Sequence, residues 1–203
     1  MKTIIIGLTG PSGAGKSIVS QIADKFNIAI IDADKLSHEV TQSNSECIKA
    51  LSNAFGPDIL QPSGSIDRKA LAKAAFSSNE NTAMLNRITH PFIKAKLCQS
   101  IKATLKQNPT AIILDAPTLF ESGCNEMCDT IISVLAPTEE RLKRILARDK
   151  ISKTAALARI AAGKTDNYYI QRSNYIIVND STMEEYFKKI TEVIKQILKN
   201  GGC

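Results

Sequence analysis

A glycine-rich octapeptide near the start of the chain carries the strongest chemical signal in the sequence. Residues 10–17 read Gly-Pro-Ser-Gly-Ala-Gly-Lys-Ser, which fits the pattern G-x-x-x-x-G-K-[ST] at every fixed position. The octapeptide follows an apolar run at 3–8 and precedes a helical pattern. In such a loop the glycines let successive backbone N–H groups converge on phosphate oxygens, and the following helix adds its positive N-terminal end. The pattern therefore predicts a site for the phosphates of a nucleoside triphosphate.

Two side chains of this loop have separate expected roles. Lys16 is predicted to bridge the β- and γ-phosphates of ATP, and the hydroxyl of Ser17 is predicted to coordinate Mg²⁺. Mg²⁺ is a hard cation that keeps several waters and needs only one or two protein ligands beside the substrate phosphates. The predicted cofactors are ATP, as co-substrate, and Mg²⁺. The residues expected to contact the nucleotide here are Ser12, Gly13, Ala14, Gly15, Lys16, Ser17 and Ile18.

Acidic residues follow two further apolar runs. Asp32 and Asp34 come after the run at 28–31, and Asp115 ends the run at 111–114. Open α/β sheets bind ligands at the carboxyl ends of their strands, so these acids are expected beside the phosphate loop. Asp34 is predicted to be the base that accepts the proton of an attacking hydroxyl. In an extended segment Asp32 would point the same way as Asp34, and it could share the site, hold Mg²⁺ through water or cap the next helix.

Asp115 and three arginines complete the candidate polar groups. Asp115 is expected to face the substrates or the metal shell. Arg141, Arg144 and Arg148 follow one another at helical offsets of three and four, so they share one face of a helix. That face could close over the transferred phosphate as a lid, where a guanidinium would stabilise developing charge. A run of arginines on a helix can equally be a solvated face, and the spacing leaves both interpretations open.

The elements that must position these groups are those of an α/β fold. Continuous apolar, β-branched runs indicate strands covered on both faces, as in a parallel sheet with helical crossovers. We therefore predict a three-layer sandwich around five parallel strands, at 3–8, 28–31, 111–114, 130–135 and 175–178. The long interval before the third strand shows helical patterns only, so residues 35–109 are predicted to form a helical insertion for a second substrate.

The predicted domains follow from these strands. Residues 1–34 and 110–203 form the nucleotide-binding core, with a helical lid at about 138–165. Within the insertion, helices are expected at 45–55, 67–76 and 79–106, the last of them interrupted around His90-Pro91 because proline disfavours an uninterrupted helix. A final helix at 182–199 carries an apolar stripe at helical spacing, made of Tyr186, Ile190, Val193, Ile194 and Ile197.

Length, charge and composition narrow the class of partner. The chain has 203 residues, a formal charge of +6 and an isoelectric point near 9.1, so it should attract anions. Only 5% of its residues are aromatic and none is Trp, which leaves few platforms for stacking nucleic-acid bases. The lysines of the last helix are spread like those of a solvated face, at positions 188, 189, 195 and 199. Small phosphorylated substrates are therefore expected rather than nucleic acid.

The cysteines and the N-terminus indicate a cytoplasmic protein. The apolar run at 3–8 is cut by polar and glycine residues too early for a membrane span or an export signal. Five cysteines form an odd set without paired C-x-x-C elements, which predicts reduced thiols, at Cys47, Cys98, Cys124, Cys128 and Cys203. We expect a monomer or a weak homo-oligomer that does not bind membranes.

Taken together, these segments resemble the dephospho-CoA kinases. The likeness runs from Ile4 to about Asp180 and keeps the family's order and spacing. Besides the phosphate loop it rests on residues 31–34, 64–68, 85–91, 114–121, 141–144 and 148–149. The resemblance implies transfer of the ATP γ-phosphoryl group to the ribose 3′-hydroxyl of dephospho-CoA, which gives coenzyme A and ADP. It also implies a P-loop kinase core, a CoA-binding insertion and a mobile lid.

The resemblance assigns further roles by position. Asp34 looks like the family's catalytic base and Arg144 like its lid arginine. His90 is expected to bind the acceptor substrate. Arg148 and Asn179 are expected near the nucleotide.

Four departures from the family pattern stand beside the likeness. Pro11-Ser12 replaces the commoner Gly-Ile, and Thr118 replaces a leucine; neither change removes a catalytic group. Gly163 replaces the usual Gln, and Ser173-Asn174 replaces the usual Ala-Asp. These two changes affect the contacts expected in the lid and on the adenine side of the nucleotide.

Two other P-loop classes, the uridine kinases and the GTPases, share part of this pattern. The phosphate loop also looks like that of uridine kinases and related nucleoside or nucleotide kinases, and this remains the alternative activity. The helical insertion at 35–109 distinguishes a dephospho-CoA kinase from a uridine kinase. A GTPase would need Asn-Lys-x-Asp, and the nearest match, Gly163-Lys164-Thr165-Asp166, lacks the Asn.

Overall fold

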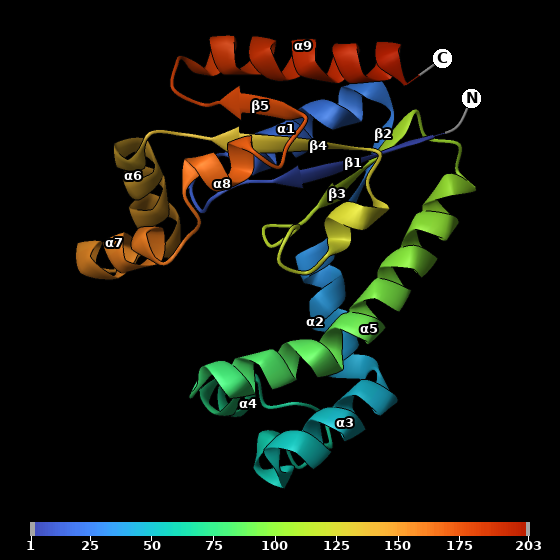
Figure 1. The fold of residues 1–203 in the computed structure, drawn as a ribbon, viewed down its shortest axis with the longest axis vertical. Helices are drawn as coiled ribbons and strands as arrows, with labels where there is room; N and C mark the ends of the chain where they lie inside the picture. The colour runs from blue at the N-terminus through green and yellow to red at the C-terminus, as the bar shows by residue number, and fades with distance from the viewer. Residues whose placement is uncertain (1–2, 202–203) are drawn as a thin grey trace. The chain divides into compact units, whose positions relative to one another are not determined.

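The structure is a computed structural model, and it describes residues 3–201. Strands and helices alternate at both ends of the chain, and helices alone fill the middle (Figure 1). The strands are β1 (Ile4–Thr9), β2 (Ile28–Asp32), β3 (Ala111–Asp115), β4 (Thr130–Leu135) and β5 (Tyr175–Val178). The α-helices are α1 (Lys16–Ala23), α2 (Ala33–Ser43), α3 (Ser45–Phe55), α4 (Arg68–Ala75), α5 (Asn79–Leu105), α6 (Thr138–Asp149), α7 (Lys153–Ala161), α8 (Asp166–Ile170) and α9 (Met183–Asn200). Short 3₁₀ turns are η1 (Asp24–Phe26), η2 (Pro57–Ile59) and η3 (Cys124–Met127).

The five strands form one sheet in the order β2-β3-β1-β4-β5. β1 pairs in parallel with β3 and with β4, and β4 pairs in parallel with β5. In this register Leu8 lies opposite Asp115, so the end of β3 is level with the start of the phosphate loop. The predicted α/β class with five parallel strands is confirmed.

Helices α1 and α9 cover one face of the sheet (Figure 1). Their apolar residues pack against alternate residues of β1, β3, β4 and β5, as the pleat of a strand requires. The predicted stripe of α9 is confirmed: Tyr186, Ile190, Ile194 and Ile197 are buried, and Val193 packs against the same core.

The opposite face of β1 meets the segment that follows β3. A methyl group built on Gly7 would lie 2.7 Å from Leu119 and 2.9 Å from Cys128, so a glycine is needed for this close approach. Leu119 is fully buried, and the N–H of Ala116 donates to the carbonyl of Leu8. The segment after β3 is therefore fixed directly to β1, the strand that leads into the phosphate loop.

The chain divides into two compact units. One comprises residues 1–31 and 103–203, and the other comprises residues 32–102. The second unit has its own apolar core, in which Cys47 and Leu51 of α3 and Ala75 of α4 are fully buried beneath side chains of α5. Asp34 belongs to this second unit, whereas the sequence grouped it with the nucleotide-binding core.

One sequence expectation about the helices of the second unit is wrong. Helix α5 runs without a break from Asn79 to Leu105 with Pro91 inside it. Proline removes one backbone donor but does not forbid the helix from continuing with a change of direction. Figure 1 shows such a change of direction part way along α5.

Helix α2 begins directly after β2, which confirms the helix-cap alternative for Asp32. Asp32 is its N-cap and accepts a hydrogen bond from the N–H of Lys35 at 2.9 Å. Asp34 therefore lies in the first helical turn rather than in an extended segment, and the two acids do not alternate along a strand. The short helix α8 was not predicted, because five residues are too few to show a period.

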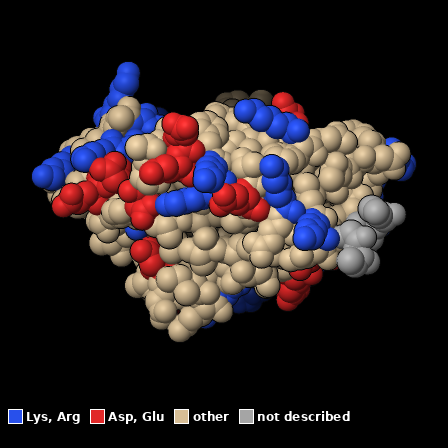
Figure 2. Space-filling model, turned by 90° about the horizontal axis from the view of Figure 1, so that it is seen from above, with Lys and Arg blue, Asp and Glu red and all other residues tan. Residues whose placement is uncertain are grey.

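The outer face of α9 mixes charges of both signs. Lys188, Lys195 and Lys199 are exposed among Glu184, Glu185 and Glu192. Figure 2 looks down on the molecule from the side of α9 and shows basic and acidic side chains interleaved. These lysines form a solvated helix face, as expected. Within residues 3–201, no helix is long and apolar enough to cross a membrane.

Candidate functional site

The phosphate loop joins β1 to α1 and uses backbone angles that favour glycine. Gly10, Gly13 and Gly15 have φ angles of 139°, 80° and 104°. Gly15 is the N-cap of α1, and a side chain there would collide with the amide of Asn179. The sequence places glycine where this turn requires it, and α1 begins at Lys16.

Side chains from three other elements hold the loop from outside. Each donates a hydrogen bond to a backbone carbonyl of residues 12–15. Arg141 Nε donates to Ser12 O (3.0 Å), Arg144 Nη1 to Gly13 O (3.3 Å) and Ala14 O (3.2 Å), Asn179 Nδ2 to Ala14 O (2.9 Å), and Tyr186 Oη to Gly15 O (3.1 Å). We refer to Arg141, Arg144, Asn179 and Tyr186 as the loop brace.

The brace determines which way the loop's donors point. In a trans peptide the C=O and the next N–H point in opposite directions. Because the carbonyls of residues 12, 14 and 15 face the brace, the N–H groups of Gly13, Gly15 and Lys16 point to the other side of the loop. Backbone N–H groups converging at a helix N-terminus are the arrangement that binds phosphate.

Burial makes the brace a fixed structure. Arg141 and Asn179 are each 5% exposed and Tyr186 is fully buried. Burial raises the pKa of the Tyr186 hydroxyl above its usual value, so the group stays a hydrogen-bond donor. The charged guanidinium of Arg141 lies at the carbonyl of Ser12 and adds positive potential beside the loop.

The two side chains predicted to act on ATP and metal sit at the start of α1. Lys16 Nζ donates to the carbonyl of Gly10 at 2.8 Å, so the ammonium folds back over the loop. Ser17 is exposed in the first turn of α1. Asp115 is half-buried at the end of β3, and the hydroxyl of Thr9 bonds the neighbouring Pro117 carbonyl at 3.1 Å.

The three arginines of α6 do not form one uniform lid face. Arg141 is buried and Arg144 is half-buried, and both bond the phosphate loop. Arg148 is exposed and pairs with Asp149 through Nε at 2.7 Å. Arg159 of α7 pairs with the same carboxylate. The hydrogen bond from Arg148 is the main reason that the pKa of Asp149 is lowered.

An aromatic cluster connects α8 with the segment after β3. Phe120 and Tyr168 meet edge to face at 5.8 Å, and Tyr168 meets Tyr169 at 5.4 Å. The guanidinium of Arg172 lies 4.2 Å from the ring centre of Tyr168. Burial raises the pKa of Tyr169 to about 12, with a further contribution from Glu121. The cluster fixes the chain on both sides of α8.

The remaining predicted residues belong to the second unit. Asp34 is exposed in the first turn of α2, four residues before His38, whose ring nitrogens lie 2.9 and 3.1 Å from Arg68 Nη2. His90 is half-buried within α5.

Sequence reasoning missed two parts of the site. Tyr186 was expected only as part of an apolar stripe, although tyrosine in such a stripe must place its hydroxyl on a partner. Arg141 was predicted to be part of a lid. It lies only three residues after the first residue of α6, and its side chain bonds the phosphate loop. No metal-binding group of three or more His, Cys, Asp or Glu residues occurs among residues 3–201, and no disulfide joins Cys47, Cys98, Cys124 or Cys128. Cys203 lies outside the described residues.

Comparisons with known proteins agree with this arrangement. A family model described as dephospho-CoA kinase matches residues 4–185. The dephospho-CoA kinase of Moorella thermoacetica is 37% identical over 181 residues, covering 89% of this chain and 85% of that protein. That of Corynebacterium glutamicum is 32% identical over 193 residues, covering 95% and 96%.

A solved structure supports the same relationship. The dephospho-CoA kinase from Campylobacter jejuni superimposes with a TM-score of 0.73 at 30% identity, covering 97% of this chain and 98% of the other. The resemblance predicted from the sequence is confirmed, and the uridine-kinase alternative is not supported. With a braced phosphate loop at the end of β1 and a family match along nearly its whole length, this chain belongs to the dephospho-CoA kinase family.

Proposed function

We propose that this chain transfers the γ-phosphoryl group of ATP to the ribose 3′-hydroxyl of dephospho-CoA, giving coenzyme A and ADP. The observation that carries the proposal is the braced phosphate loop in a chain of this family. The brace turns three backbone N–H groups to one side of the loop, where an anion would be bound. Because the loop is held in this shape in advance, the triphosphate need not order it on binding.

The nucleotide side of the reaction is assigned to residues of the loop. The N–H groups of Gly13, Gly15 and Lys16 would cradle the phosphates, with the side chain of Lys16 on the outer phosphates. Ser17 would hold Mg²⁺, with Asp115 or Asp32 acting through water. One protein hydroxyl and one or two outer carboxylates suit a cation that keeps most of its waters, and bound Mg²⁺ would neutralise the charge on the phosphates.

The acceptor side is assigned to Asp34 and to the unit of residues 32–102. The carboxylate of Asp34 would orient the 3′-hydroxyl and accept its proton as the new P–O bond forms. His90 would contact the acceptor. Arg144 is proposed to supply charge to the transferred phosphoryl group, for which its guanidinium would have to leave the carbonyls of Gly13 and Ala14 that Nη1 bonds in this structure. Arg148 would lie toward the nucleotide, and Asn179 would act on the nucleotide through the loop, because its Nδ2 bonds the carbonyl of Ala14.

The proposal also covers the location, the oligomeric state and the class of substrate of the enzyme. We expect a cytoplasmic monomer or weak homo-oligomer that acts on two small molecules and not on nucleic acid. The interleaved charges on α9 support this expectation, because nucleic-acid sites gather basic side chains on one surface. Light scattering after gel filtration measures the oligomeric state.

The test is an ADP-release assay with a panel of acceptors. Purified enzyme, ATP and Mg²⁺ are combined with dephospho-CoA, uridine, nucleoside monophosphates or no acceptor. We expect dephospho-CoA to be preferred by orders of magnitude in kcat/KM. A preference for uridine or for a monophosphate would reject the proposed acceptor.

The role of Asp34 is tested in the same assay. Asp34→Asn keeps the shape of the side chain but removes the base, so kcat should fall about 100-fold or more while KM for ATP changes less than about twofold. Asp58→Asn, at an exposed position in η2 of the same unit, is the matched control. Near-parental turnover by Asp34→Asn would remove this residue from the base role.

A further inference from the structure

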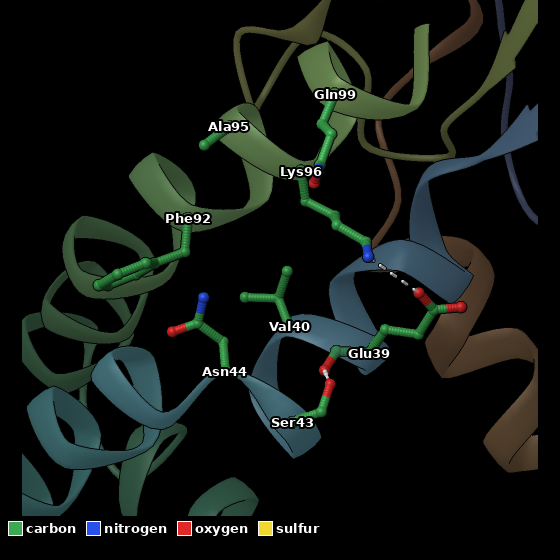
Figure 3. A pocket seen from close by; sticks show the side chains of 8 residues that line it. All are labelled: Glu39, Val40, Ser43, Asn44, Phe92, Ala95, Lys96 and Gln99. Atoms are coloured by element: carbon green, nitrogen blue, oxygen red, sulfur yellow. Dashed lines mark hydrogen bonds and ion pairs between the residues drawn. The ribbon is translucent and has the colours of Figure 1, made fainter. Parts of the chain in front are cut away.

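Arg141 of α6 is 5% exposed and carries a charge that no neighbouring acid compensates. No carboxylate among residues 3–201 forms an ion pair with its guanidinium. Cations elsewhere have such partners: in a groove of about 410 Å³ lined by α2 and α5, Lys96 Nζ lies 3.7 Å from Glu39 Oε2 (Figure 3). Because arginine keeps its proton in proteins, a full positive charge is held inside the fold beside the phosphate loop.

A buried charge of this kind is costly without an anion. Removal from water disfavours a charge unless an opposite charge or several hydrogen bonds compensate it. Arg141 makes one hydrogen bond, from Nε to the carbonyl of Ser12 at 3.0 Å. The phenol of Tyr169 lies in the field of Arg141, but burial raises the pKa of Tyr169 to about 12, so this group supplies no negative charge at neutral pH. An anion bound at the loop would compensate the guanidinium.

The backbone of Arg141 is fixed against the loop as well. Its N–H donates to the carbonyl of Pro137 at 3.0 Å, in the first turn of α6. A methyl group built on Gly13 would lie 2.7 Å from the carbonyl oxygen of Arg141 and 3.0 Å from its Cα, so α6 lies directly against the loop. A lid side chain has to move when substrates bind. Arg141 cannot leave the loop without opening this backbone contact.

The hydrogen bond from Arg141 acts on one particular peptide group. The carbonyl of that group belongs to Ser12 and its N–H belongs to Gly13, and in a trans peptide the two point in opposite directions. In the part of the chain that the structure describes, the N–H of Gly13 donates to no protein acceptor. A charged donor on the carbonyl polarises the peptide, and hydrogen bonds in such a chain strengthen one another. The N–H of Gly13 therefore becomes a stronger donor for an anion on the far side of the loop.

We propose that Arg141 is a positioning residue for the triphosphate: it polarises the peptide group between Ser12 and Gly13, so that the N–H of Gly13 binds a phosphate oxygen more tightly. This inference rests on the proposed function, because it needs a phosphate at that N–H. The guanidinium stays on the outer side of the loop and does not touch the nucleotide. Its charge destabilises the enzyme without nucleotide and is compensated when the phosphate binds.

Arg141→Gln separates the charge from the hydrogen bond. Glutamine keeps a side-chain NH₂ group that can donate to Ser12, but it is neutral. We expect the Kd of ATP, measured by isothermal titration calorimetry without acceptor, to rise about tenfold, the order expected for one charge within several ångströms of a phosphate. KM for dephospho-CoA should change less than about twofold. Arg141→Lys keeps the charge, so its Kd for ATP should stay within about threefold of the parental value.

Lys143→Gln is the matched control. Lys143 lies two residues after Arg141 on α6, is exposed and pairs with Glu140 at 2.7 Å, so its substitution makes the same change in net charge. The Kd of ATP should stay within about twofold of the parental value, because an exposed charge is screened. A loss as large as that of Arg141→Gln would show that the net charge of α6 attracts the nucleotide, which would overturn the proposal.

Thermal unfolding gives a second readout, whose sign distinguishes a positioning charge from a purely structural contact. Without nucleotide, Arg141→Gln should unfold at the parental temperature or up to about 4 °C above it, because a buried uncompensated charge has been removed. At a fixed ATP concentration the rise in unfolding temperature should be smaller than in the parent, because ATP binds more weakly. If the variant without nucleotide unfolds about 4 °C or more below the parent and its rise with ATP is unchanged, Arg141 only supports the fold.

The outcomes separate this inference from the proposed function. If the parent enzyme phosphorylates dephospho-CoA but Arg141→Gln keeps the parental Kd for ATP, the charge of Arg141 is not used, although the proposed function stands. A tenfold loss in Arg141→Lys would also reject the inference, because that variant keeps the charge. If the parent enzyme neither binds ATP nor phosphorylates dephospho-CoA, both proposals fall. Circular dichroism of each variant confirms that it is folded.

Discussion

At the scale of single residues, the site depends on side chains that act on the backbone of the phosphate loop. The loop brace bonds carbonyl oxygens, and the N–H groups that we propose to bind phosphate are turned away from it. Tyr186 is the most distant of these residues in sequence, 171 positions from the glycine it contacts. Its hydroxyl connects the C-terminal helix α9 directly to the phosphate loop.

Removing this hydroxyl should therefore weaken ATP binding more than catalysis. In Tyr186→Phe the carbonyl of Gly15 keeps the N–H of Ile18 but loses the side-chain donor that the brace supplies to it, so the loop becomes less firmly held. We expect KM for ATP to rise about threefold to tenfold, because an intramolecular hydrogen bond contributes about 0.5–1.5 kcal/mol. KM for dephospho-CoA should stay unchanged.

Steady-state kinetics with each substrate varied in turn measure this difference. Tyr175→Phe, in β5, removes a tyrosine hydroxyl elsewhere in the same unit and serves as the control. An equal rise in both KM values would show that Tyr186 supports the fold in general and does not position the loop.

The residue scale also shows what sequence patterns leave undecided. The position of Gly15, Lys16 and Ser17 in the site follows from a complete motif and needs no structure. That Asp32 caps a helix did need the structure, because the backbone turns helical at Ala33. The partner of the Tyr186 hydroxyl depends on a contact between distant segments, which helical periodicity alone does not encode.

At the scale of elements, α9 links the sheet to the phosphate loop and depends on its own N-terminus. Thr182 Oγ1 accepts from the N–H of Glu185, and the Glu185 side chain accepts from the N–H of Thr182, which completes a capping box. Thr182→Ala should lower the free energy of unfolding by about 1 kcal/mol, because the first turn loses its side-chain acceptor.

Urea unfolding followed by circular dichroism measures this loss. Ser181→Ala, at the exposed neighbouring position, should have an effect within about 0.5 kcal/mol. If both variants unfold at the parental urea concentration, the capping box does not contribute to the stability of α9.

Strands were easier to predict than the helices between them. Buried parallel strands give continuous apolar runs, and all five were found within one residue at each end. Helix α3 also agrees with its predicted bounds. Helix α5 was misjudged because a helix can pass through Pro91 with one backbone bond missing, and packing of its apolar residues on the core of the second unit outweighs that loss.

At the scale of the whole molecule, the fold should become less stable at alkaline pH, because a half-buried thiol and a buried phenol keep their protons in the folded state. Burial raises the pKa of Cys128 from 9.0 to about 12 and that of Tyr169 from 10.0 to about 12. The folded state keeps these protons at a pH where the unfolded chain releases them. Stability from these groups is therefore fully present below about pH 9 and is lost as pH rises toward 12.

The contribution of one group can be isolated by substitution. The free energy of unfolding of the parent should fall between pH 9 and 11, and Cys128→Ala should reduce the slope by roughly 1 kcal/mol per pH unit. Urea unfolding at pH 8, 9, 10 and 11 gives both slopes. Identical slopes for the two proteins would show that Cys128 is not protected from ionisation by the fold.

The chain as a whole combines a nucleotide-binding sheet with a second, helical unit. The first contains a phosphate loop held from outside by buried side chains. The second contains Asp34, the proposed base, in the first turn of α2. We propose that these are the two substrate sites of a single phosphoryl transfer.

The most direct test of this account is the position of the phosphate in the product. Enzyme, ATP, Mg²⁺ and dephospho-CoA are incubated, and the product is examined by mass spectrometry and ³¹P NMR. The account predicts one added phosphomonoester on the ribose 3′-oxygen and an equal amount of ADP. A phosphate on another oxygen, or ADP formed together with free phosphate and unchanged dephospho-CoA, would contradict it.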